Sequence, residues 1–342
     1  MFAQLLEKLH RRQDLTEEEA SAAMAEIMEG RAQAAQIAGF LVALGMKGER
    51  PREIVGLART MRARATKLTR EFAPVFDTCG TGGDRAHTFN VSTIAALVVA
   101  ACGVRVAKHG NRSVSSRCGS ADVLEALGVN ITAPPEVVER CLDEAGIAFF
   151  FAPTFHPSMR HAGPARKELG IRTAFNLLGP LTNPAGARRQ LVGVPKPELT
   201  ELVARSLALL GSERAWVVHG ADGLDEVSTT GYTKVSEVKD GAVNTFYVHP
   251  HDFKLPKAGP EALRGGDAAA NATITRNVLS GKPGPAREIV LLNAGISLLV
   301  AGEVPNVGEG IDRAAAAIDS GAASATLEKL AAVSQMGAAV GS

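Results

Sequence analysis

The chain has 342 residues, more than a single hydrophobic core usually supports, so two domains are expected. Its 37 basic and 36 acidic residues leave a formal net charge of +1, which argues against a protein that binds nucleic acid over its whole surface but permits a local basic pocket. The four cysteines show no Cys-x-x-Cys spacing, and no apolar run approaches the roughly 18 residues of a membrane-spanning helix. We therefore expect a soluble cytoplasmic protein with reduced thiols.

The first 72 residues are predicted to be helical. Apolar residues recur at spacings of three and four, Thr16 and Glu19 form a capping box, and Pro51 suits the first turn of a later helix. Residues 34–44 are mostly small or apolar and carry no charge. Such a helix packs closely against a partner, and the sequence leaves open whether that partner lies in the same domain or across a dimer interface.

From about residue 74, short apolar runs alternate with helical stretches, which predicts a mainly parallel α/β sheet. The expected strands are 75–76, 104–107, 147–152, 215–219 and 243–248. A helix is expected over 288–301, and residues 259–272 are expected to form a polar loop. Ligand sites should gather at the carboxyl ends of the strands.

A glycine-rich stretch, Cys79–Asp84, comes directly before a predicted helix at 94–104. Its three glycines let backbone N–H groups approach a ligand, and Asn90, Ser92 and Thr93 lie where a helix N-terminus carries partial positive charge. This pattern favours a phosphate or pyrophosphate site, although a tight strand-to-helix turn is the alternative. Neither a P-loop nor a Gly-x-Gly-x-x-Gly motif is present, which disfavours ATP hydrolysis and dinucleotide binding.

Two further polar stretches follow predicted strands. Residues 108–116, with Arg117 and residues 119–122, combine cations, hydroxyls and glycines, which indicates a second polyanion site or else a solvated loop. Asp225 and Glu226 suit Mg²⁺, although an acidic surface turn explains them equally well. Two anion sites and an acidic pair on one sheet together favour a magnesium-bound diphosphate.

A fourth stretch carries Arg160, Arg166 and Lys167, which are expected on one helix. Arginine offers a bidentate fork for a carboxylate. For Arg160 and Lys167 a solvent-facing position is the preferred interpretation.

These motifs closely resemble those of the anthranilate phosphoribosyltransferases of tryptophan biosynthesis. Enzymes of that family join anthranilate to the ribose of phosphoribosyl pyrophosphate and release pyrophosphate. The resemblance extends from the N-terminal helices to about residue 327, and its specific motifs are residues 80–84, 90–93, 108–116, 119–122, 166–184 and 222–228.

The resemblance implies a small, discontinuous all-helical domain hinged to a larger α/β domain with a mainly parallel central sheet. The helical domain would comprise residues 1–72 and a returning segment at about 160–190, and the α/β domain residues 73–159 and 191–342. Members of the family are usually homodimers that associate through their helical parts.

The resemblance also implies roles for individual residues. Binding of the diphosphate and ribose falls to Gly80, Gly82, Gly83, Asp84, Asn90, Ser92, Thr93, Lys108 and Ser120, with Thr88 as a further substrate-binding residue. The anthranilate path is lined by His109, Asn111, His156, Arg166 and Gly179, with Arg166 facing the carboxylate. Mg²⁺ is bound by Ser92, Asp225 and Glu226, and the catalytic residues are Lys108, Asp84 and Arg166.

One residue departs from the family pattern: Arg85 follows the loop aspartate where glycine is common, which alters loop mobility or adds a phosphate contact. The implied mechanism is displacement at the anomeric carbon through a transition state with oxocarbenium character. A pyrimidine nucleoside phosphorylase and a non-enzymatic nucleic-acid-binding protein of the same fold are the alternatives. Residues 108–112 and the pair Asp225 and Glu226 weigh against the phosphorylase. The near-neutral charge and the intact motifs weigh against the nucleic-acid-binding protein.

Overall fold

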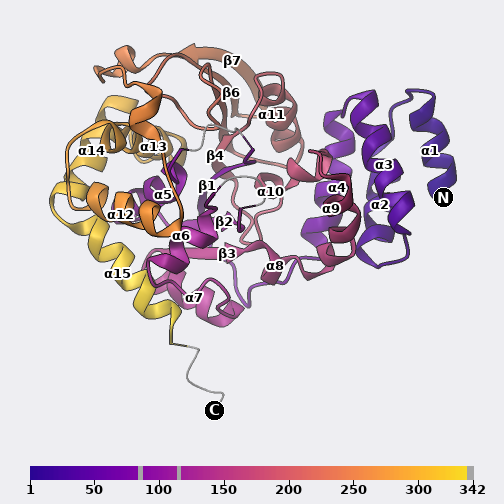
Figure 1. Ribbon diagram of the computed structural model, residues 1–342, viewed down its shortest axis with the longest axis horizontal. Coiled ribbons are helices and arrows are strands. Elements are labelled where there is room, and N and C mark those ends of the chain that lie inside the picture. Colours follow the sequence, from indigo (N-terminus) through magenta and orange to yellow (C-terminus); the bar gives the residue numbers. More distant parts are fainter. Residues whose placement is uncertain (84–87, 114–116, 337–342) are drawn as a thin grey trace.

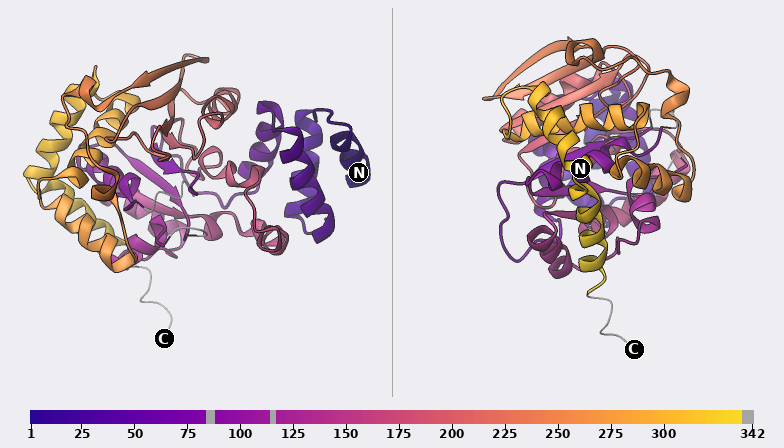
Figure 2. Two further views of the ribbon diagram at one scale, coloured as in Figure 1. Left: turned by 45° about the horizontal axis from the view of Figure 1, so that its top comes forward. Right: turned by 90° about the vertical axis from the view of Figure 1, so that its left-hand side faces the viewer.

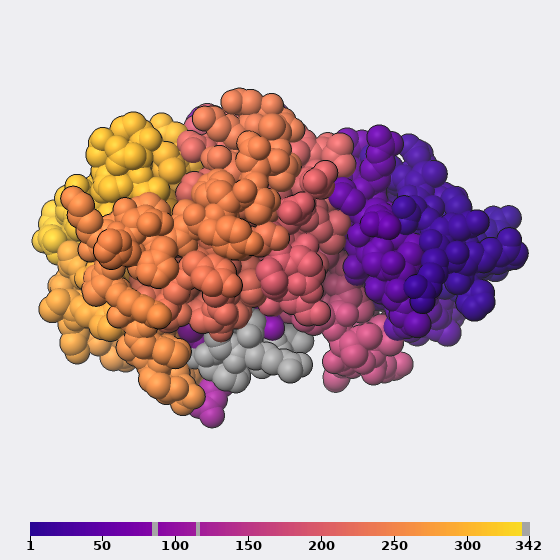
Figure 3. Space-filling view, turned by 90° about the horizontal axis from the view of Figure 1, so that it is seen from above, coloured from indigo at the N-terminus to yellow at the C-terminus, as the bar shows by residue number. Residues whose placement is uncertain are grey.

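The computed structural model describes residues 1–83, 88–113 and 117–336. A helical bundle forms one end of the molecule and a larger α/β domain the other (Figure 1). The bundle stands apart in a turned view (Figure 2), and the space-filling view places it opposite the C-terminal helices (Figure 3). This architecture confirms the predicted fold class.

The bundle begins with four helices, as the sequence predicts. They are α1 (Phe2–His10), α2 (Glu17–Met28), α3 (Ala34–Lys47) and α4 (Pro51–Ala63). The capping box before α2 is present: the Thr16 hydroxyl accepts the Glu19 N–H at 3.2 Å, and the Glu19 carboxylate accepts the Thr16 N–H at 2.8 Å. Pro51 is the first residue of α4, where a missing N–H costs no hydrogen bond.

The α/β domain is built on one seven-stranded sheet. Its strands are β1 (Phe76–Gly80), β2 (Val106–Gly110), β3 (Ile147–Phe151), β4 (Arg189–Gly193), β5 (Arg214–Gly220), β6 (Thr233–Lys239) and β7 (Ala242–Val248). Their order is β3-β2-β1-β4-β5-β6-β7, with β1 to β5 parallel and β6 and β7 antiparallel. The mainly parallel sheet is therefore confirmed.

Some strand boundaries differ from the prediction. Both β1 and β2 extend further toward their carboxyl ends, so Cys79, Gly80, Lys108 and His109 lie in strands instead of loops. Strands β4 and β6 were not predicted. Strand β4 pairs along its whole length with β1, which is distant in sequence and which a local pattern does not reveal. Strand β6 instead forms a hairpin with β7, its neighbour in sequence, and the prediction missed it.

Helices cover both faces of the sheet. They are α5 (Val91–Ala101), α6 (Ser120–Ala126), α7 (Pro135–Glu144), α11 (Leu199–Leu209), α12 (Ala268–Leu279), α13 (Pro285–Ala301), α14 (Val307–Asp319) and α15 (Ala322–Ser334). The nearly all-apolar α5 and α13 pack against each other and the sheet, whereas α11 lies between the sheet and α4 of the bundle. The prediction of a polar loop over 259–272 is wrong in its second half, because α12 begins there with Asp267 as its N-cap residue. Two 3₁₀ helices, η3 (Pro250–Phe253) and η4 (Pro260–Leu263), precede it.

A returning segment of short helices packs against α2, α3 and α4 of the bundle. It comprises α8 (Ala152–Phe155), η1 (Pro157–His161), α9 (Gly163–Leu169), η2 (Ala174–Asn176) and α10 (Leu178–Leu181). The prediction that one helix carries Arg160, Arg166 and Lys167 is wrong. Arg160 lies in η1, and the other two lie in α9, which starts at Gly163. The exact domain boundaries at 72/73, 159/160 and 190/191 stay predictions.

All four cysteines are buried and free. Among the described residues, no helix combines the length and the apolarity needed to span a bilayer.

Candidate active site

A cavity of about 560 Å³ lies where the carboxyl ends of the central strands meet the returning segment. It is lined by sixteen of the predicted site residues: Gly80, Gly82, Gly83, Thr88, Asn90, Ser92, Thr93, Lys108, His109, Asn111, Ser120, His156, Arg166, Gly179, Asp225 and Glu226. The remaining predicted residue, Asp84, lies outside the described residues, as does Arg85. The fold thus gathers into one cavity residues that are up to 146 positions apart in sequence, from Gly80 to Glu226.

The glycine loop, residues 80–83, starts at the last residue of β1 and contacts the turn that carries Asp225 and Glu226. The Thr81 N–H donates to the Gly193 carbonyl at 2.9 Å, and the Gly82 N–H donates to Asp225 Oδ2 at 2.9 Å. Gly82 and Gly83 have φ values of +66° and +79°, a conformation that side chains rarely adopt. A Cβ at Gly80 would overlap the Asp225 carboxylate. The loop therefore presents backbone N–H groups beside a carboxylate.

The N-terminus of α5 forms the neighbouring wall of the cavity. Asn90 is the N-cap residue, and the Ser92 N–H donates to Glu226 Oε1 at 3.1 Å. Both carboxylates of the acidic pair thus accept hydrogen bonds from the predicted anion site, which consists of the glycine loop and the N-terminus of α5 and is called the anion cradle below. A phosphate that enters can replace these carboxylates as acceptor, since a helix N-terminus and a glycine loop both favour anions.

The acidic pair also fits a divalent cation. Two carboxylates and the Ser92 hydroxyl provide the hard oxygen donors that Mg²⁺ prefers, and this ion usually takes one or two carboxylates together with substrate phosphates. Within the described ranges, no group of three or more His, Cys, Asp or Glu residues could bind a metal. The donor set of the acidic pair therefore suits an ion that also takes ligands from its substrate.

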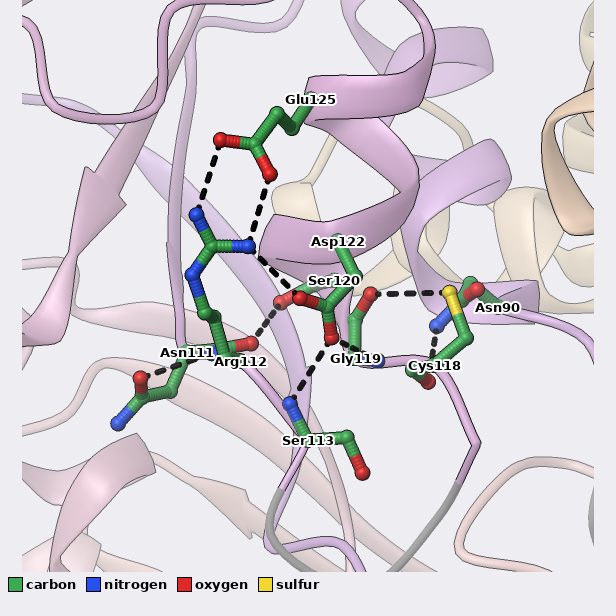
Figure 4. Close-up of polar contacts among 9 residues, drawn as sticks. All are labelled: Asn90, Asn111, Arg112, Ser113, Cys118, Gly119, Ser120, Asp122 and Glu125. Carbon is green, nitrogen blue, oxygen red and sulfur yellow. Dashed lines mark hydrogen bonds and ion pairs between the residues drawn. The ribbon is translucent and has the colours of Figure 1, made fainter. Parts of the chain in front are cut away.

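The second polar loop is organised by Asp122 (Figure 4). Its carboxylate accepts the Ser113 N–H at 3.1 Å, the Gly119 N–H at 2.8 Å and Arg112 Nη1 at 2.9 Å. Burial opposes ionisation, but these hydrogen bonds outweigh it and lower the pKa of Asp122. Arg112 also pairs with Glu125. The charge of Arg112 is thus already balanced, and the loop offers backbone and hydroxyl groups to a ligand instead.

Lys108 lies at the floor of the cavity and not on its rim. Its buried Nζ donates to the Thr78 carbonyl at 2.7 Å, and its neighbour Asp77 accepts hydrogen bonds from His109 N and Asn183 Nδ2. Burial lowers the pKa of Lys108 and raises that of Asp77, while the attraction between them partly opposes both shifts. The Nζ of Lys108 is thus held in place at the cavity by the Thr78 carbonyl.

Two buried histidines face each other with ring centroids 5.2 Å apart. His109 Nδ1 lies 3.0 Å from the Gly179 carbonyl, and His156 Nε2 lies 3.0 Å from the Thr182 carbonyl. Because a carbonyl only accepts, each of these nitrogens carries the proton. Burial lowers the pKa of both rings, that of His156 to about 3, so both are neutral at pH 7. The other ring nitrogens, His109 Nε2 and His156 Nδ1, are buried acceptors without a partner among the described residues.

Arg166, in the last turn of α9, is partly buried and lines the same cavity as the two histidines. Its guanidinium lies 5.9 Å from the Phe175 ring centroid, and burial lowers its pKa. Within the described part of the chain, no carboxylate acts on the pKa of Arg166, and burial alone shifts it. A desolvated guanidinium without a counter-ion favours an anionic ligand, and its fork matches a carboxylate.

Sequence reasoning assigned no site role to Arg172, a cavity residue that makes specific contacts. Arg172 lines the cavity and donates from Nη1 to the Gly82 carbonyl at 2.5 Å and from Nη2 to the Thr81 carbonyl at 3.3 Å. Its partners are 90 and 91 positions away. No local pattern distinguishes this arginine from its neighbours, so only the fold reveals it.

The fold and the site together define a glycosyl transferase built from a helical bundle and an α/β domain. The chain matches the model of the "Glycosyl transferase family, helical bundle domain" over residues 3–65 and that of the "Glycosyl transferase family, a/b domain" over residues 73–324. These two matches cover the bundle and most of the sheet domain.

Similar proteins narrow this class. Anthranilate phosphoribosyltransferase from Moorella thermoacetica is 58% identical over 318 residues, which are 93% of this chain and 94% of the relative. The crystal structure of the enzyme of that name from Thermus thermophilus aligns with a TM-score of 0.91 at 45% identity, covering 97% of this chain and 99% of that one. The Saccharomyces cerevisiae enzyme, solved in complex with PRPP and Mg, aligns with a TM-score of 0.89 at 28% identity over 98% of both chains. The chain belongs to the anthranilate phosphoribosyltransferase family.

Proposed function

We propose that this enzyme transfers the phosphoribosyl group of 5-phosphoribosyl 1-pyrophosphate to the amine of anthranilate. The products are N-(5-phosphoribosyl)anthranilate and pyrophosphate, and the reaction is a step of tryptophan biosynthesis. The observation that carries this proposal is a single cavity with two unlike halves. One half has the glycine loop, the α5 N-terminus and the acidic pair, and the other has Arg166 and the two neutral histidines. These halves match a diphosphate and an aromatic amino acid, respectively.

The diphosphate half would bind and neutralise the leaving group. Gly80, Gly82, Gly83 and the first turn of α5 line the cavity, and Lys108 lines it with its Nζ held by the Thr78 carbonyl. Asp84, Thr88, Asn90, Thr93 and Ser120 would complete this half. Such preorganised donors stabilise the charge that develops as pyrophosphate leaves.

The enzyme uses Mg²⁺, and Ser92, Asp225 and Glu226 would bind it. When bound, this ion neutralises charge on the pyrophosphate and so makes it a better leaving group. The two carboxylates would then be drawn away from the Gly82 and Ser92 N–H groups, which are left to donate to the substrate.

The other half would bind and orient anthranilate. Arg166 would receive the carboxylate, while Asn111 and Gly179 line the path. The amine is a hydrogen-bond donor, and His109 Nε2 and His156 Nδ1 are acceptors without a partner among the described residues. They would hold the amine with its lone pair toward the anomeric carbon, and the proximity of the two reactants lowers the barrier to attack.

We also propose that the enzyme acts in the cytoplasm as a homodimer. The four free, buried cysteines suit a reducing compartment. In α3, Ile37, Phe40, Leu41 and Leu44 are buried within the chain, which accounts for one face of this small-residue helix, whereas Met46 at its end is 75% exposed. Sedimentation equilibrium would test the assembly, and a single species with the mass of one chain would contradict it.

The activity can be tested by mixing the purified protein with phosphoribosyl pyrophosphate, Mg²⁺ and anthranilate. We expect the fluorescence of anthranilate to fall as product forms, and EDTA to abolish this fall. Phosphorolysis of thymidine or uridine without loss of anthranilate would instead favour a nucleoside phosphorylase.

A further inference from the structure

Arg172 connects two parts of the molecule that would hold different substrates. Its backbone lies between two helix caps of the returning segment: Gly170 ends α9 in a left-handed conformation with φ +62°, and the Thr173 N–H donates to Asn176 Oδ1 at 2.9 Å. Ala174 and Phe175 are buried in the core that the segment shares with the bundle. The backbone of Arg172 is therefore fixed to the helical part of the structure.

The side chain of Arg172 reaches the glycine loop, which belongs to the sheet domain. The guanidinium donates to the carbonyls of Thr81 and Gly82, and a Cβ at Gly83 would overlap it. On the other side of the same loop, the Gly82 N–H donates to Asp225. The peptide groups on either side of Gly82 are thus held between a cation and a carboxylate.

The same short segment carries Arg166, the residue proposed to receive the anthranilate carboxylate. The Gly170 N–H donates to the Arg166 carbonyl at 3.3 Å, and the Arg166 guanidinium lies over the ring of Phe175. A ligand that draws Arg166 into the cavity therefore acts on the segment that positions Arg172. Through Arg172, the same movement acts on the carbonyls of the anion cradle.

We infer that Arg172 is a positioning residue that couples the two substrate sites, so that a carboxylate at Arg166 strengthens binding of the diphosphate at the glycine loop. This inference rests on the proposed function. Its physical basis is that Arg172 fixes two peptide groups of a glycine loop that would otherwise lose much backbone entropy on binding. Binding energies are linked reciprocally, so the diphosphate must strengthen carboxylate binding by the same factor.

The test compares equilibrium binding of phosphoribosyl pyrophosphate with Mg²⁺, with and without saturating benzoate. Benzoate has the carboxylate but no amine, so no reaction occurs. In the wild-type enzyme we expect benzoate to tighten diphosphate binding about fivefold or more, in the range of ordinary allosteric coupling. In Arg172→Met this factor should fall to about one, while benzoate binding alone stays unchanged because Arg166 is intact.

Two further variants separate coupling from other effects. Arg172→Lys keeps the charge but loses the planar fork, so it should restore only part of the coupling. Lys167→Met removes a charge from the same segment at an exposed position and should keep the full factor. Because Arg172 is itself exposed, its replacement leaves the hydrophobic core intact.

Two results would overturn the inference while leaving the proposed function in place. One is weaker diphosphate binding in Arg172→Met with the coupling factor preserved, which would make Arg172 a simple ligand contact. The other is a wild-type enzyme that forms product yet shows no coupling. A wild-type protein that binds neither ligand would overturn the proposed function and this inference together.

Discussion

The burial of His156 predicts a specific dependence of stability on pH. Its Nε2–H donates to the Thr182 carbonyl in a buried site, and burial lowers the pKa of the ring from 6.5 to about 3. In the unfolded chain the ring takes up a proton below pH ~6.5, whereas the folded enzyme resists protonation until pH ~3. Between these values the unfolded state binds more protons, so the free energy of unfolding falls as the pH falls.

The size of this effect follows from the pKa difference. Each pKa unit corresponds to about 1.4 kcal/mol, so His156 alone should lower the free energy of unfolding by about 2 kcal/mol between pH ~7.5 and pH ~5. In His156→Gln the amide keeps a donor for the Thr182 carbonyl but does not titrate. The variant should therefore lose about 2 kcal/mol less than the wild type over this interval, whatever its stability at neutral pH.

Urea unfolding at several pH values would measure this difference. The chain has a single tryptophan, Trp216, which is buried against Phe246 and reports on the sheet domain. His109 is present in both proteins, so its contribution cancels in the comparison. An equal loss of stability in wild type and His156→Gln would refute the conclusion that the folded enzyme keeps His156 neutral.

Three further outcomes are expected. Combined Asp225→Asn and Glu226→Gln should lower kcat at saturating Mg²⁺ by about 100-fold or more, since the leaving group loses its charge stabilisation, with unchanged tryptophan fluorescence; full activity would remove the metal assignment. Arg166→Ala should raise the anthranilate KM about tenfold or more, the cost of a charged hydrogen bond, and an unchanged KM would exclude it from carboxylate binding. Gly193→Ala should cut kcat/KM by about 100-fold, because its Cβ would overlap the Asp225 backbone and displace this carboxylate. Gly231→Ala, with open space around its Cβ, should match the wild type. Equal activity of the two variants would refute the conclusion that the position of Asp225 matters for activity.

Local sequence patterns determined the elements whose signals lie within a few neighbouring residues. The spacing of apolar residues, the Thr16 capping box and Pro51 specified the helices of the bundle, because helix formation depends on contacts three and four positions apart. The glycines before α5 likewise specified a tight turn with positive φ at Gly82 and Gly83, because this conformation is a local property of glycine.

The tertiary structure decided what depends on distant partners. Strand β4 pairs with the distant strand β1, and Gly82 meets Asp225 across 143 positions. The protonated nitrogen of each histidine is chosen by a carbonyl from the returning segment. The role of Arg172 likewise depends on a loop 90 positions away. The sequence alone determined the types of chemical group at the site, whereas their geometry, charge state and mutual contacts required the fold, because burial and hydrogen bonding are properties of neighbours in space.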